Sequence, residues 1–264
     1  MKHAMYEDLE GKNVLITGGY GFLGRALCTE FARQRANLII MDKVATDQAF
    51  VDGLRSQGVE IEYIQVDFES QDSRTDAITK MHSKYSKLDV LINNAAYVGT
   101  TAALGWAVPF AEQSIETWRN AIEVNLTTPF HLVQGLLELL EKSDDPVVVN
   151  LGSIYGSLGP DWKMYTGTSM GNPAAYAASK GGLIQLTRWL ATTLGPKVRV
   201  NCVSPGGINR NQDEKFVEKY ITRTPLARMA MEDDVVSAIL FLSASSANYI
   251  TGHNLEVNGG WSSW

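Results

Sequence analysis

The chain has 264 residues, 45% of them hydrophobic, which is enough to bury a substantial core. No composition shift or flexible linker divides it, so we expect one domain. A net charge of −6, with 23 basic residues scattered along the chain, excludes the basic stripe that binding to nucleic acid requires. No apolar run approaches the roughly 18 residues of a membrane span, so we expect a cytoplasmic protein without nucleic-acid or membrane partners.

The first predicted unit is a strand, a glycine-rich turn and a helix. Residues 13–17 (NVLIT) are typical of a strand buried on both faces of a parallel sheet, and apolar residues then recur at helical spacing up to Phe31. In the intervening GGYGFLG, Gly18 permits a tight turn, Gly21 lets the backbone approach a pyrophosphate, and Gly24 lets the helix pack closely on the strand. The alternative is a turn that is merely tight. The residues predicted to contact the cofactor here are Gly18, Tyr20, Gly21, Phe22, Leu23 and Gly24.

The second predicted strand, residues 37–41, ends at Asp42. An acid at this point can accept both hydroxyls of an adenosine ribose and repels a 2′-phosphate, which favours NAD over NADP. Lys43 could offset part of that repulsion, whereas the glycine turn contains no basic residue to attract the extra phosphate.

Helices over 46–57 and 71–85 alternate with strands over 60–66 and 88–92. Asp67 and Phe68 follow the third strand, where Asp67 can contact the adenine amino group or, equally well, cap the next helix. Small and amide side chains after the fourth strand let the cofactor lie against the backbone at Asn94, Ala95 and Ala96.

The irregular segment 99–113 is a candidate substrate-side loop, and a long amphipathic stretch follows from residue 114 to 140. Pro129 predicts a kink in that stretch, close to Asn125, because proline lacks a backbone donor and obstructs the preceding turn. A fifth strand, residues 146–151, leads to Ser153 at the carboxyl edge of the sheet, where ligands bind in doubly wound folds.

The helix expected over 173–194 carries Tyr176 and Lys180 four residues apart, and so on one face. An ammonium beside a phenol lowers the pKa of the phenol, which can then exchange a proton with an alcohol or a carbonyl. The same spacing also occurs by chance on solvated helix faces, so the surrounding motifs must decide. After a sixth strand, residues 197–203, comes a further candidate cofactor contact formed by Pro205, Gly206, Gly207 and Ile208.

A polar, mobile-looking lid over 209–231, a helix over 232–243 and a strand over 253–257 complete the pattern. Strands and helices alternating seven times predict an α/β fold, a doubly wound and mostly parallel seven-stranded sheet with helices on both faces (a Rossmann fold), in one domain spanning 1–264. Two isolated cysteines and four dispersed histidines give no metal-ligand spacing, so no metal is expected.

Together, TGGYGFLG, Asp42, NNAA, Asn125, Ser153, YAASK and PGGI resemble the short-chain dehydrogenase/reductase family over nearly the whole chain. The resemblance implies a catalytic tetrad of Asn125, Ser153, Tyr176 and Lys180. In it, Tyr176 exchanges the proton, Ser153 orients the substrate oxygen, and Lys180 holds the nicotinamide ribose and depresses the pKa of the tyrosine. Asn125 anchors a water that relays protons, and the cofactor supplies the hydride.

Three departures from the family pattern stand out. Phe22 occupies the usual place of the middle glycine, the Ser153–Tyr176 spacing is about ten residues longer than usual, and the family's threonine near Arg210 is missing. The enlarged loop, residues 157–172, suits a polyhydroxylated substrate better than an acyl chain and looks similar to oxidoreductases of bacterial surface-sugar pathways, including flagellin modification. Its polar and aromatic candidates are Asp161, Trp162, Lys163, Tyr165, Thr166 and Thr168.

The leading hypothesis is therefore an NAD-dependent oxidoreductase acting on a sugar or another small polar alcohol. The alternatives are a 3-oxoacyl reductase using NADPH and a non-catalytic dinucleotide sensor or scaffold. Apolar residues in excess of one sheet-facing stripe on the helix 173–194 and on the kinked helix within 114–140 predict a homotetramer or homodimer. We expect the tail 255–264, which ends in two tryptophans, to pack at a second subunit interface, the alternative being a frayed terminus.

Overall fold

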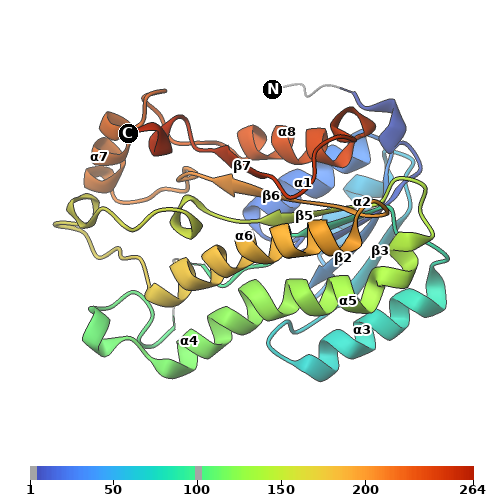
Figure 1. Cartoon of the computed structure of the whole chain (residues 1–264), viewed down its shortest axis with the longest axis horizontal. Helices are drawn as coiled ribbons and strands as arrows, with labels where there is room; N and C mark the ends of the chain where they lie inside the picture. Colours follow the sequence, from blue (N-terminus) through green and yellow to red (C-terminus); the bar gives the residue numbers. More distant parts are fainter. Residues whose placement is uncertain (1–4, 99–102) are drawn as a thin grey trace.

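The computed structural model describes residues 5–98 and 103–264, which form a three-layer α/β structure (Figure 1). Every strand pair in its seven-stranded sheet is parallel, in the order β3-β2-β1-β4-β5-β6-β7. The strands are β1 Asn13–Thr17, β2 Asn37–Asp42, β3 Ile61–Gln65, β4 Val90–Asn93, β5 Val147–Leu151, β6 Arg199–Pro205 and β7 Asn254–Val257. The predicted fold class is confirmed, and the central strands are buried on both faces because helices cover each side.

Helices on the two faces of the sheet enclose separate hydrophobic cores. One core lies under α1 (Phe22–Arg33), α2 (Gln48–Arg55) and α8 (Glu232–Ser243). The other lies under α3 (Gln71–Lys84), α5 (Thr128–Glu141) and α6 (Ala174–Leu194), with α4 (Ile115–Ile122) alongside α6. The carboxyl ends of the central strands therefore open onto one edge of the molecule, between the two helical layers.

The kink predicted in the stretch 114–140 is a turn of π-helix, Glu123–Thr127, which separates α4 from α5. Thr128 N–H donates to the carbonyl of Glu123, five residues back. Pro129 has no N–H, so it cannot donate to the main-chain carbonyl of Asn125. The proline thus contributes to the break, but the wide turn itself makes the bend and presents Asn125 to the interior.

The predicted lid over 209–231 contains a helix, α7 (Glu214–Arg223), which the sequence reading missed. Phe216 and Tyr220 are buried on one side of α7, and this packing orders a segment that is otherwise polar. In the predicted substrate-side loop, residues 99–102 lie outside the described part of the chain, and Trp106 is buried against Tyr97. No helix among the described residues is both long and apolar enough to cross a membrane.

Candidate active site

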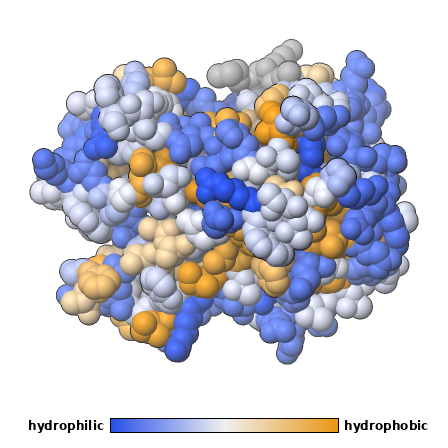
Figure 2. All heavy atoms as spheres, viewed as in Figure 1, coloured by the Kyte–Doolittle hydropathy of each residue, from blue (hydrophilic) through white to orange (hydrophobic). Residues whose placement is uncertain are grey.

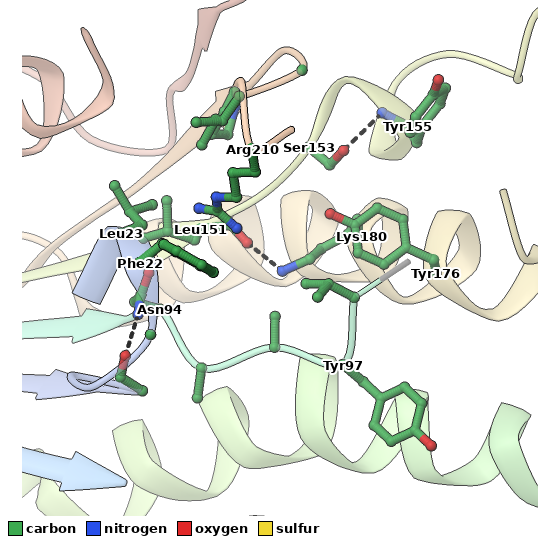
Figure 3. Close-up of a pocket in the computed structure, with 18 of the residues that line it drawn as sticks. Phe22, Leu23, Asn94, Tyr97, Leu151, Ser153, Tyr155, Tyr176, Lys180 and Arg210 are labelled. Carbon is green, nitrogen blue, oxygen red and sulfur yellow. Dashed lines mark hydrogen bonds between the residues drawn. The ribbon is translucent and has the colours of Figure 1, made fainter. Parts of the chain in front are cut away.

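A cavity of about 1010 Å³ lies at the carboxyl edge of the sheet. All of the residues that the sequence assigned to cofactor binding line it, and so does Ser153. Figure 3 shows residues from the glycine turn, β4, β5 and α6 converging on this space. Of the predicted tetrad, only Asn125 is not among the residues that line the cavity.

The glycine turn fits a phosphate-binding role. Gly18 has a φ of +66°, which favours glycine, and the N-terminus of α1 behind it has no side-chain cap and no acid in its first turn. A Cβ at Gly24 would lie 2.0 Å from the carbonyl oxygen of Gly18, so this glycine packs against the turn rather than the strand. Strand contact belongs to Gly19, where a Cβ would lie 2.5 Å from Cγ2 of Ile40.

Asp42 lies at the tip of β2, where its carboxylate shapes the adenosine end of the cavity. It accepts hydrogen bonds from the N–H of Tyr20 at 2.9 Å and of Val44 at 3.3 Å. These donors hold the buried carboxylate at the cavity wall. The Tyr20 ring stacks on Tyr63, with ring centroids 5.3 Å apart, and closes the wall beside it.

Two further strand ends form the neighbouring wall. Asp67 accepts from Glu69 N–H at 3.0 Å, and α3 is capped by Ser70, so the alternative role of Asp67 as the helix cap is wrong. Asn94 donates from Nδ2 to the carbonyls of Thr17 at 2.9 Å and of Gly18 at 3.1 Å. Asn94 therefore ties the end of β4 to the glycine turn.

Ser153 and Tyr176 face the cavity from β5 and α6 (Figure 3). Burial raises the pKa of Tyr176, and a hydrogen bond with Ser153 and the charge of Arg210 only partly oppose that rise. The expected depression of this pKa by Lys180 is thus not found, because burial dominates. A phenol with a raised pKa is protonated at neutral pH and can donate a proton.

Lys180 lies one helical turn beyond Tyr176 and is 2% exposed. Its Nζ donates to the Leu151 carbonyl at 2.6 Å and lies 5.9 Å from the centroid of the Tyr176 ring. Burial lowers the pKa of Lys180 to about 8. The ammonium is therefore anchored to the end of β5, next to the phenol.

Asn125 acts on the site from behind the cavity wall. Its side chain accepts from Tyr97 N–H at 2.6 Å, and its Nδ2 donates to the Tyr97 carbonyl at 3.0 Å and to Ser179 Oγ at 2.9 Å. The fully buried amide thus joins the π-turn, the segment after β4 and α6. These contacts make Asn125 a positioning residue for the helix that carries Tyr176.

The cavity wall beyond Ser153 contains Tyr165, Phe216 and Tyr220. These rings belong to an aromatic ladder, the successive ring contacts of Trp162, Tyr165, Phe216, Tyr220 and Trp261. Trp261 is 3% exposed and stacks on Tyr220 at 4.4 Å, so its side chain packs within the subunit and the frayed-terminus alternative is wrong for this residue. Packing of the tail at a second subunit interface stays a prediction. The Tyr220 hydroxyl in turn accepts from the N–H of Gly207 at 2.6 Å, which connects the ladder to the predicted cofactor contact after β6.

The enlarged loop contributes to this wall, but mostly through residues that the sequence did not single out. Of its six polar and aromatic candidates, only Tyr165 lines the cavity. Asp161 instead pairs with Arg223 of α7 at 2.5 Å, and Trp162 is 58% exposed. The other lining residues from the loop are Ser169, Met170, Gly171 and Asn172.

Asn172 and Arg210 are two of the polar lining residues that sequence reasoning missed. Asn172 is 7% exposed, and neither amide atom has a hydrogen-bond partner within the described chain. Arg210 points into the cavity above Phe22 (Figure 3). From the sequence, Arg210 was noted only because the family usually has a threonine near this position. Loop residues have no periodicity, so the orientation of the Arg210 side chain could not be inferred.

A nicotinamide dinucleotide fits these residues. The uncapped N-terminus of α1 suits the pyrophosphate, Asp42 suits ribose hydroxyls, and Lys180 lies beside Tyr176 at the opposite end. Among the described residues, no cluster of three or more metal-ligating side chains is found.

Comparison with known proteins finds a matching family model and relatives that are similar over nearly the full length of the chain. A family model described as enoyl-(acyl carrier protein) reductase matches residues 22–262. The 3-oxoacyl-[acyl-carrier-protein] reductase of Thermotoga maritima is 32% identical over 261 residues, 96% of this chain and 98% of that protein. The post-translational flagellin modification protein A of Campylobacter coli is 28% identical over 264 residues, 96% of this chain and 99% of that protein.

Solved structures are similar along the whole length. A short-chain dehydrogenase from Leptospira borgpetersenii with bound NAD⁺ has 31% identity and a TM-score of 0.85, covering 99% of this chain and 98% of its own. A candidate NAD(P)-dependent gluconate 5-dehydrogenase from Beutenbergia cavernae, with NADP at low occupancy, has 26% identity and a TM-score of 0.85, covering 97% of this chain and 99% of its own.

Proposed function

Because the chain belongs to the short-chain dehydrogenase/reductase family of oxidoreductases that act on CH–OH groups, we propose that it interconverts a secondary alcohol and a ketone on a small polar substrate. NAD is the proposed cofactor, and a sugar or amino-sugar derivative is the proposed substrate. The observation that carries the proposal is the cavity that joins Asp42 and the glycine turn to Ser153, Tyr176 and Lys180.

Each residue of this site has a distinct task. In the reducing direction, the neutral phenol of Tyr176 donates its proton to the substrate oxygen, while Ser153 hydrogen-bonds the same oxygen and steadies its developing charge. Lys180, anchored on Leu151, holds the nicotinamide ribose. The cofactor supplies or accepts the hydride when it is bound.

The preference for NAD rests on Asp42. Its carboxylate is held at the cavity wall by two backbone donors, and a 2′-phosphate placed there would meet like charge in a partly desolvated position. Fluorescence titration of the wild type with NADH and NADPH tests this preference. Tighter or equal binding of NADPH would refute it, and Asp42→Ala should narrow the gap between the two affinities.

The polar-substrate proposal is supported by the orphaned amide of Asn172 and by the paired hydroxyls of Tyr155 and Tyr165, 2.5 Å apart, in the wall beyond Ser153. The flagellin-modification relative agrees with the resemblance to surface-sugar oxidoreductases. A 3-oxoacyl reductase is the second candidate, because the relative from Thermotoga maritima has that activity in its name.

The deciding experiment follows NADH and NADPH absorbance with a panel of sugars, amino sugars and their phosphates, alongside acetoacetyl-coenzyme A. The proposal expects turnover with at least one polyhydroxylated compound and NAD(H). Turnover of acetoacetyl-coenzyme A alone would favour the 3-oxoacyl reductase instead. The Tyr176→Phe variant serves as the control for turnover in this site.

A further inference from the structure

Arg210 is the cavity residue that neither the proposed chemistry nor the family pattern explains. It follows β6 in the segment after Ile208, and its main-chain N–H donates to Gln212 Oε1 at 2.7 Å. Its guanidinium carbon lies 5.1 Å from the centroid of the Phe22 ring, and Phe22 is the first residue of α1. Figure 3 shows the guanidinium between Phe22 on one side and Lys180 and Tyr176 on the other.

One nitrogen of this guanidinium holds it in place. Nε lies 3.3 Å from Oε1 of Glu232, and the side chain of Arg210 is 26% exposed. Neither terminal nitrogen donates a hydrogen bond to another residue in the described chain. The two terminal NH2 groups are therefore available to a ligand, in the fork geometry that matches phosphate oxygens.

The surroundings of Arg210 indicate which ligand this is. Phe22 begins a 12-residue helix whose first backbone N–H groups are uncapped and point toward the glycine turn. At the adenosine end, the cavity is lined by the acids Asp42, Asp67 and Glu69, which would repel a dianionic pyrophosphate. A cation facing the start of α1 offsets that repulsion.

We propose that Arg210 clamps the pyrophosphate of the dinucleotide cofactor from the side opposite the N-terminus of α1. This inference rests on the proposed function for the identity of the cofactor. Arg210 is a cofactor-binding residue in this assignment, and Glu232 is the positioning residue that directs its terminal nitrogens.

The test is calorimetric titration of the wild type and of Arg210→Gln with NADH, ADP-ribose and adenosine. Loss of charge-assisted hydrogen bonds should weaken NADH and ADP-ribose about tenfold to a hundredfold and leave adenosine, which has no phosphate, unchanged. The affinity of the wild type for NADH should also fall more steeply with salt than that of the variant. Arg35→Gln, an exposed arginine paired with Glu10, is the matched control and should bind all three ligands like the wild type.

Two outcomes would overturn the clamp. If Arg210→Gln binds NADH and ADP-ribose as tightly as the wild type, the clamp is refuted. If the KM of the substrate rises in that case, Arg210 instead binds an anionic group on the substrate. Arg210→Lys keeps the charge but loses the fork, so it should recover only part of the affinity. If the wild type itself binds neither NADH nor NADPH, the proposed function fails with the clamp, which distinguishes that failure from an effect of Arg210 alone.

Discussion

Replacing Lys180 by methionine should stabilise the empty protein at neutral pH. Methionine keeps an unbranched side chain in the same buried position but cannot be charged. In the wild type, lowering the pKa of Lys180 from 10.5 to about 8 costs the folded state about 3 kcal/mol at pH 7, at about 1.36 kcal/mol for each pKa unit. The variant loses the hydrogen bond to the Leu151 carbonyl, which destabilises it by about 1 kcal/mol. We therefore expect the variant to be more stable than the wild type by about 2 kcal/mol.

The sign of the pH dependence follows from the two states of the lysine. Below pH 8 the side chain is charged in both folded and unfolded protein, so the folded state bears the full cost of the buried ammonium. Between pH 8 and pH 10.5 the folded protein releases the proton first, and the cost declines until it disappears. At pH 9.5 it should be about 1.5 kcal/mol, which leaves the two proteins within about 0.5 kcal/mol of each other.

Urea unfolding followed by tryptophan fluorescence, at pH 7 and at pH 9.5 without cofactor and at equal subunit concentration, measures this difference. Lys142→Met, at the exposed lysine that directly follows α5, is the control and should show the same difference from the wild type at both pH values. A wild type that is more stable than Lys180→Met at pH 7, or a difference that does not change with pH, would refute the reasoning. The variant should lose turnover in every case.

Three further predictions concern turnover, packing and assembly. Tyr176→Phe should reduce turnover by about 10²–10⁴-fold. Its NADH affinity and urea midpoint should stay near those of the wild type, because only one hydroxyl is removed. Near-normal activity would show that another group transfers the proton. Trp261→Ala should cost about 3–5 kcal/mol of unfolding free energy, against about 1 kcal/mol for the exposed Trp264, and equal effects would contradict the stacking on Tyr220. Light scattering at micromolar concentration should give a dimer or tetramer through α5 and α6, on which Phe130 and Trp189 are exposed, and a monodisperse monomer would exclude it.

The assembly prediction now rests on fewer residues than the sequence suggested. Most of the apolar side chains of α5 and α6 on which the prediction was based are buried within the subunit, including Leu183, Leu190 and Leu136. Figure 2 shows apolar patches over the part of the surface formed by α4 and α6, separated by polar side chains. The large apolar residues that remain exposed on these three helices are Ile115 and Trp118 on α4, Phe130 on α5 and Trp189 on α6. Ile115 is the first residue of α4.

The strands and their carboxyl-edge residues could be predicted because parallel strands buried on both faces read as short, continuous apolar runs. β1 begins and ends at the predicted residues. As expected, Asp42 is the last residue of β2, and Asn94 and Ser153 come just after β4 and β5. Local patterns of this kind place a residue at the end of a strand, and the parallel sheet then brings the strand ends together.

The wall opposite the cofactor could not be predicted in the same way, because long-range packing forms it. The contact of Tyr220 with Trp261 joins residues about forty positions apart, and no local pattern indicates that pairing. A signal for α7 was present, since Phe216, Val217, Tyr220 and Ile221 recur at helical spacing within an otherwise polar segment. The direction of Arg210 depends on the path of a loop, which amino-acid pattern does not specify.

The π-turn Glu123–Thr127 makes this part of the chain sensitive to its length rather than to its composition. Removing one residue would let the backbone return to a regular α-helix and would rotate α4 by roughly 100° relative to α5. Ala121, which packs with Ala175 and the Tyr176 ring, would then turn away from α6. In a library of single-residue deletions, active clones should therefore be depleted across residues 115–127, even where substitutions at the exposed positions of α4 are accepted.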